Sequence, residues 1–173
     1  MMVTYQLQGV WPSPSKAIQD EVVSFWLAEG ALPDPAIASQ RACELMVVAR
    51  NAAHQIVGVS TAKPACVDQL RFECFYYRTF VGSANRSRGL HSTGLVWRIL
   101  QESHRLLNQR FQEGCDPNVL GIYMEIENDK VMRFRNDAVW QENGMNVVYI
   151  GQTRDGRHIR VWYFDGARIP QRT

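Results

Sequence analysis

One carboxylate falls in a run of residues where a charged side chain is unexpected. Glu125 lies within Val119 to Ile126, which is otherwise almost continuously apolar and typical of a strand buried on both faces. Burying a carboxylate is costly unless it has a partner or holds its proton more tightly than usual. Either situation would single out Glu125 as a candidate for proton transfer.

A second feature is the loop Gly82 to Gly89, which consists of small and basic residues and precedes the longest helical pattern of the chain. The first N–H groups of a helix lack partners and carry a partial positive charge, so a glycine-containing loop before a helix can hold a phosphate. Most such loops are ordinary turns. Composition therefore leaves both interpretations open.

The other reactive residue types form no pattern typical of a site. The four histidines, His54, His91, His104 and His158, are scattered, and none belongs to a metal-ligand set or a catalytic triad. We interpret His104, inside the long helical pattern, as a solvated residue. The four cysteines are far apart and are expected to be reduced core residues, with no metal bound. They are Cys43, Cys66, Cys74 and Cys115.

The elements that must position these residues follow from hydrophobic periodicity and turn signals. The predicted strands are Val3 to Gln8, Leu45 to Arg50, Gln55 to Lys63, Arg71 to Val81, Val119 to Ile126, and a hairpin of Val147 to Gly151 and His158 to Phe164 around Asp155-Gly156. The predicted helices are Lys16 to Ala28 capped by Ser15, a short turn over Pro35 to Gln40, a long helix through Leu95 and Phe111 closed by Gly114, and a last helix from Asn128 to about Trp140.

Length and charge indicate a single compact domain over residues 1–173. Of these residues, 46% are hydrophobic and 21% are charged, which is ordinary for a globular protein. A net charge of +2 is too small to favour a nucleic acid or a membrane as the partner. The amino terminus has no basic start followed by an apolar run, so we expect a cytoplasmic protein.

The segment from Val81 to His91 resembles the acyl-CoA-binding motif of the GNAT N-acyltransferases, [Q/R]-x-x-G-x-[G/A]. Arg86 matches the first position and Gly89 the glycine, whereas His91 replaces the final small residue. The order of predicted elements also resembles this family over nearly the whole chain. The resemblance implies a mixed α+β fold with three layers, α-β-α, and a central, mostly antiparallel sheet that is splayed between its fourth and fifth strands.

The resemblance also implies a cofactor site between the two splayed strands. Acetyl-CoA or another acyl-CoA would extend along Val81, with its pyrophosphate on the N–H groups that follow. Arg88 either contributes a charge-assisted bond there or is a solvated loop charge. The cofactor-binding residues implied in this way are Val81, Arg86, Ser87, Arg88, Gly89, Leu90, His91 and Asn128.

The implied reaction is direct attack of an amine on a thioester, which needs a proton acceptor and a proton donor. Glu73, on the same strand face as Phe75 and Tyr77, is one candidate base, and Glu125 is the other. Glu73 is also interpretable as a surface carboxylate beside Arg71. The usual tyrosine acid of the family is replaced by Trp140, so Tyr76, Tyr77, Tyr123 or a water would have to donate the proton.

The sequence therefore predicts an enzyme that transfers an acetyl or other short acyl group from acyl-CoA to a primary amine of a small molecule or protein. Because His91 and Trp140 depart from the family pattern, a catalytically silent acyl-CoA-binding module is the alternative. A homodimer is compatible with either interpretation. A third, weaker hypothesis is that the basic carboxy-terminal hairpin binds nucleic acid or an acidic surface.

Overall fold

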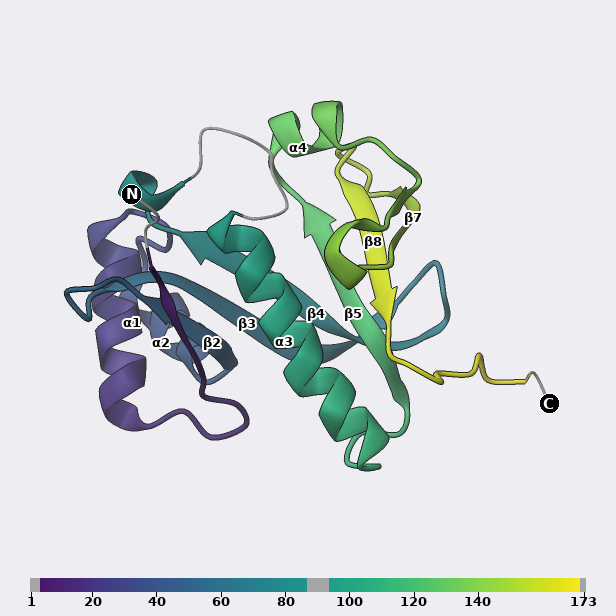
Figure 1. The fold of residues 1–173 in the computed structure, drawn as a ribbon, viewed down its shortest axis with the longest axis horizontal. Coiled ribbons are helices and arrows are strands. Elements are labelled where there is room, and N and C mark those ends of the chain that lie inside the picture. Colours follow the sequence, from purple (N-terminus) through teal and green to yellow (C-terminus); the bar gives the residue numbers. More distant parts are fainter. Residues whose placement is uncertain (1–3, 87–93, 172–173) are drawn as a thin grey trace. The chain divides into compact units, whose positions relative to one another are not determined.

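The structure, a computed structural model, describes residues 4–86 and 94–171 (Figure 1). Its α-helices are α1 (Lys16–Ala28), α2 (Pro35–Ala42), α3 (Leu95–Gln112) and α4 (Asp129–Phe134), and short 3-10 turns span η1 (Ser83–Asn85) and η2 (Glu142–Gly144). Its strands are β1 (Gln6–Gly9), β2 (Leu45–Arg50), β3 (Ile56–Val67), β4 (Phe72–Val81), β5 (Val119–Ile126), β6 (Val139–Trp140), β7 (Val147–Gln152) and β8 (His158–Tyr163).

The strands form one mixed sheet in the order β1-β2-β3-β4-β5-β8-β7-β6. The pairs β1 with β2, β2 with β3, β5 with β8, β8 with β7, and β7 with β6 are antiparallel. The central pair, β4 with β5, is parallel. This arrangement confirms the predicted fold class, a mostly antiparallel sheet whose fourth and fifth strands run side by side in the same direction.

The chain divides into two compact units. Unit 1 comprises Met1–Ala62 and Arg78–Ser103, and unit 2 comprises Lys63–Tyr77 and His104–Thr173. The strands β3 and β4 and the helix α3 each run from one unit into the other. The prediction of one domain over residues 1–173 therefore stays a prediction.

In unit 1, helices cover both faces of the sheet. The α1 residues Val22 and Trp26 share a buried cluster with Val59 of β3. The neighbouring residue Gly58 faces the other way, where a Cβ atom would lie 2.8 Å from the Cδ1 atom of Ile99 in α3. Because side chains alternate along a strand, α1 and α3 lie on opposite faces.

In unit 2, β8 separates two groups of buried side chains. Val161 packs in one cluster with Cys74 of β4. The next residue, Trp162, stacks on His104 of α3 at a centroid distance of 3.7 Å. The second half of α3 therefore covers one face of the sheet here, and the cluster around Val161 lies on the other.

The last helix is shorter than its sequence predicts. The cap is confirmed, since Asn128 accepts hydrogen bonds from the N–H groups of Lys130 and Val131 at 2.9 and 3.3 Å. However, α4 ends at Phe134, and Trp140 lies in the short strand β6, paired with Val147. Pairing with β7 and burial of the indole override the helical pattern.

Two predictions about burial were wrong. His104 is 7% exposed rather than solvated, because its ring packs flat against Trp162. Of the cysteines, only Cys74 is buried, whereas Cys43, Cys66 and Cys115 are exposed free thiols. The predicted end of β3 at Lys63 was also wrong, since the strand continues past Pro64 to Val67.

Candidate functional site

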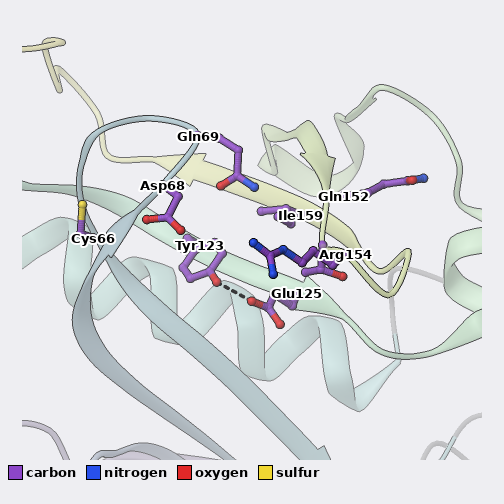
Figure 2. Close-up of a pocket in the computed structure, with 9 residues that line it drawn as sticks. Cys66, Asp68, Gln69, Tyr123, Glu125, Gln152, Arg154 and Ile159 are labelled. Atoms are coloured by element: carbon purple, nitrogen blue, oxygen red, sulfur yellow. Dashed lines mark hydrogen bonds between the residues drawn. The ribbon is translucent and has the colours of Figure 1, made fainter.

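A cavity of about 290 Å³ lies on unit 2, on the face of β5 that carries Tyr123 and Glu125. Residues from three parts of the unit form its wall: the end of β3 with the turn that follows it, the strands β5 and β8, and the end of β7 with the turn that follows it (Figure 2). The lining residues are Cys66, Asp68, Gln69, Tyr123, Glu125, Gln152, Thr153, Arg154 and Ile159. We call this cavity the β5 pocket.

Two polar side chains of β5 form the centre of the β5 pocket. The Tyr123 hydroxyl donates a hydrogen bond to Oε1 of Glu125 at 2.6 Å, as the dashed line in Figure 2 marks. The Tyr123 ring stacks on Tyr76 of β4, with centroids 5.0 Å apart. Burial, followed by the hydrogen bond to Glu125, raises the pKa of the Tyr123 phenol far above its ordinary value. Tyr123 therefore holds its proton at neutral pH.

The second oxygen of Glu125 faces an arginine. Nη1 of Arg157 lies 3.6 Å from Oε2 of Glu125 and 3.3 Å from Oε1 of Glu127, and Nε of Arg157 lies 2.9 Å from Asp155. One guanidinium is thus shared among three carboxylates, which leaves an excess of negative charge at this end of β5. The sequence left a partner or a more tightly held proton open for Glu125, and the structure gives this carboxylate two partners, Tyr123 and Arg157.

The Tyr123 and Glu125 pair begins at the last residue of β5 that pairs with β4. Within the described residues, the parallel pairing runs from Glu73 opposite Val119 to Tyr76 opposite Tyr123. Beyond this last pair, β4 continues into unit 1 as far as Val81, and β5 continues within unit 2 to Ile126. The parallel pairing of the fourth and fifth strands agrees with the resemblance, and the splay between them stays a prediction.

The other two catalytic candidates lie on β4. Glu73 is exposed and stands opposite Val119, at the paired end of the two strands. Tyr77 is only 3% exposed and directly follows the last paired residue of β4. The three catalytic candidates of the sequence therefore do not form one cluster: Glu125 lines the pocket, and neither Glu73 nor Tyr77 does.

In unit 1, the start of the predicted cofactor loop is held by two side chains. Nε of Arg86 donates to the carbonyl of Val81 at 2.9 Å, and the guanidinium lies 5.1 Å from the centre of the Phe80 ring. The Glu29 carboxylate accepts the N–H of Ser83 at 2.9 Å. Ser87, Arg88, Gly89, Leu90 and His91 lie outside the described residues.

Sequence reasoning missed two charged residues of the β5 pocket, Asp68 and Arg154. Both lie in turns between strands, and they reach the pocket only because β3, β5 and β8 meet there. A partial signal for Arg154 was present, since Asp155-Gly156 marks the turn, where Gly156 has a φ angle of 87°. No comparable signal identifies Asp68.

Within the described ranges, no group of histidine, cysteine and acidic residues could hold a metal ion. In the same part of the chain, none of the helices has the length and apolar character needed to cross a bilayer.

Comparison with solved structures identifies the fold. NAA60 of Arabidopsis thaliana in complex with a bisubstrate analogue aligns over 95% of this chain and 100% of its own, with a TM-score of 0.51 and 12% identity. The ribosomal-protein-S5-alanine acetyltransferase of Vibrio fischeri aligns over 97% of both chains, with a TM-score of 0.50 and 10% identity. The ribosomal-protein-S18-alanine N-acetyltransferase of Escherichia coli aligns over 92% of both chains, with a TM-score of 0.50 and 11% identity.

No family model matches the chain, and no curated protein matches it in sequence. The structural likeness nevertheless covers the chain from end to end. The protein therefore has the fold of the GNAT acetyltransferases.

Proposed function

We propose that this protein is an acyl-CoA-dependent N-acyltransferase that moves an acetyl or other short acyl group to a primary amine of a small molecule or protein. The fold supports acyl transfer in general. The observation that carries the proposal is the Tyr123 and Glu125 pair on β5, which joins a proton acceptor to a proton donor at 2.6 Å. These are the two groups that aminolysis of a thioester requires.

The resemblance indicates which residues would hold an acyl-CoA. Following the resemblance, the backbone near Val81 would bind the amides of the pantetheine arm. Arg86 and the N–H groups of residues 87–91 would hold the pyrophosphate. Asn128 uses its side-chain oxygen to cap α4, so its amide N–H groups would be the ones to bind the cofactor.

Acyl-CoA would supply the activated acyl carbon, and the β5 residues would move the protons. Glu125 accepts a proton from the acceptor nitrogen. Tyr123 donates its hydroxyl proton to the departing sulfur and recovers one from Glu125 across the 2.6 Å hydrogen bond. The pair is then restored, and the second proton of the original ammonium leaves to water.

A comparison of Glu125→Gln with Glu73→Gln tests this assignment, since both substitutions keep the shape and remove a carboxylate. Release of free CoA thiol from acetyl-CoA should be followed with a panel of primary amines. A general base contributes about a hundredfold to ten-thousandfold, so Glu125→Gln should lose that much of kcat at pH 7 and regain part of it as rising pH deprotonates the amine. Tyr123→Phe should also lower kcat while leaving the affinity for acetyl-CoA unchanged.

Glu73→Gln distinguishes the two candidate bases. Because Glu73 is exposed at the paired end of β4, we expect this variant to keep most of its activity. A large loss in Glu73→Gln with none in Glu125→Gln would transfer the role to Glu73. Tight binding of acetyl-CoA without CoA release from any amine would contradict catalysis and favour a silent binding module.

A further inference from the structure

The β5 pocket contains charges of both signs, and they come from different elements. Asp68 lies in the turn after β3, and Glu125 lies on β5. Arg154 lies in the turn between β7 and β8, and Figure 2 shows its guanidinium pointing toward Tyr123 and Glu125. A ligand in this pocket would therefore meet carboxylates and a guanidinium together.

Arg154 differs from the neighbouring arginine in its partners. Arg157 contacts three carboxylates within 3.6 Å. Arg154, in the part of the chain that the structure describes, has no hydrogen bond and no ion pair, although Glu125 and Asp68 line the same pocket. The guanidinium of Arg154 is thus available to an anionic group of a ligand.

The turn that carries Arg154 is fixed in place. The carbonyl of Thr153 accepts the N–H of Gly156 at 3.0 Å, and its hydroxyl accepts the N–H of Arg157 at 3.0 Å. The Thr153 hydroxyl also donates to the Asp155 carboxylate. A guanidinium on a braced turn loses less conformational freedom when it binds a partner, which favours a recognition role.

The size and remaining lining of the pocket indicate a small polar ligand. A volume of about 290 Å³ is at the lower end of the range for ligand pockets. Gln69 and Gln152 add amide donors and acceptors, while Ile159 is the only aliphatic side chain of the lining. Such a wall suits a compact molecule with several polar groups better than a long apolar one.

From these observations, and resting on the proposed function, we infer that the acceptor is a small amine that also carries a carboxylate, a compound of the amino-acid class. Its ammonium binds Glu125, the group that takes the proton, and its carboxylate binds Arg154. Arginine presents paired N–H donors that match the two oxygens of a carboxylate. A ligand of this kind satisfies both charges of the pocket, whereas a plain amine leaves Arg154 without a partner.

The test uses matched pairs of probes that differ only by a carboxylate. Binding of 4-aminobutyrate is compared with propylamine, and β-alanine with ethylamine, by calorimetry on the full chain with CoA present. We expect the amino acids to bind more tightly than their amines. Arg154→Gln should weaken the binding of the amino acids by about tenfold or more and leave the affinity for the amines unchanged. Arg168→Gln, an exposed arginine that does not line the pocket, is the matched control and should change neither.

The result separates this inference from the proposed function. Three outcomes overturn the inference. Amines and amino acids bind equally well, or Arg154→Gln keeps its full affinity for the amino acids, or no probe binds at all. If alkylamines still release CoA from acetyl-CoA in those cases, the proposed function stands. If the amino acids bind through Arg154 but no acceptor releases CoA, the ligand class is supported and the transferase proposal fails.

Discussion

At the residue scale, the candidate base is oriented through both of its oxygens. Tyr123 bonds to Oε1 of Glu125 and Arg157 faces Oε2, so the carboxylate has one preferred orientation. A base held in this way loses little freedom when an amine arrives. The side chain is also 21% exposed, which leaves room for a ligand to reach it.

The buried residue His104 makes stability depend on pH. Its Nε2 atom lies 3.2 Å from the carbonyl of Tyr163, which can only accept, so the neutral ring donates this bond. Burial lowers the pKa of His104 from 6.5 to about 4. Because the unfolded chain binds the proton more readily, the contribution of His104 is fully present above pH 6.5 and is lost as the pH falls toward 4. The loss is about 3 kcal/mol at most.

Urea unfolding at several pH values checks this prediction. The free energy of unfolding of the wild type should fall between pH 6.5 and 4 more steeply than that of His104→Gln, which lacks the titrating ring. The comparison removes the contribution of the other titratable groups to the pH dependence, since both proteins share them. Identical pH slopes for the two proteins would show that His104 is not the cause.

At the element scale, the segment from α4 to β6 is held by one arginine and one tryptophan. Arg160 of β8 is fully buried, and its Nη2 atom donates to the carbonyls of Arg135 and Asp137 at 3.2 and 2.9 Å. Its guanidinium lies 3.9 Å from the centre of the Trp140 ring. The indole N–H donates to the carbonyl of Arg135 at 2.9 Å. The arginine is therefore not part of an exposed basic surface.

Substitutions at Trp140 measure how much this packing contributes. Trp140→Ala removes a ring that is 2% exposed and should cost about 3–5 kcal/mol. Trp140→Phe keeps an aromatic ring and loses one hydrogen bond to the carbonyl of Arg135. Because this carbonyl still accepts a hydrogen bond from Arg160, the substitution should cost about 1 kcal/mol of stability. Urea unfolding of both variants gives the two values. A phenylalanine variant as unstable as the alanine variant would show that the N–H bond, not the ring, is decisive.

Elements with a clear periodic pattern or turn signal could be predicted from the sequence, whereas β6 could not. The helix Lys16–Ala28 and the strand Val119–Ile126 are observed with the predicted bounds. β6 has two residues, too few for any alternation, and it exists because β7 pairs with it. Glu125 was identifiable as a charge in an apolar run, whereas the availability of Arg154 depends on which turns meet in three dimensions.

At the scale of the whole molecule, this chain shares its fold with solved structures that have few of the same residues. The solved structures that share it are about 10% identical to this chain. A fold needs apolar residues at core positions and suitable turns, and many sequences supply these. Function depends on particular side chains instead, which is why the acceptor has to be inferred from the β5 pocket and not from the fold.

Binding of acetyl-CoA is the most direct test of the central claim. The melting temperature should be measured with increasing acetyl-CoA and, as the control, with ATP, which lacks the pantetheine arm. A ligand at about 100 times its dissociation constant adds roughly 2.7 kcal/mol to the free energy of unfolding, so a clear rise is expected with acetyl-CoA. The rise should vanish in Gly89→Asp, where a carboxylate would repel the pyrophosphate. No rise at millimolar acetyl-CoA or other acyl-CoAs, or the same rise with ATP, would contradict the assignment.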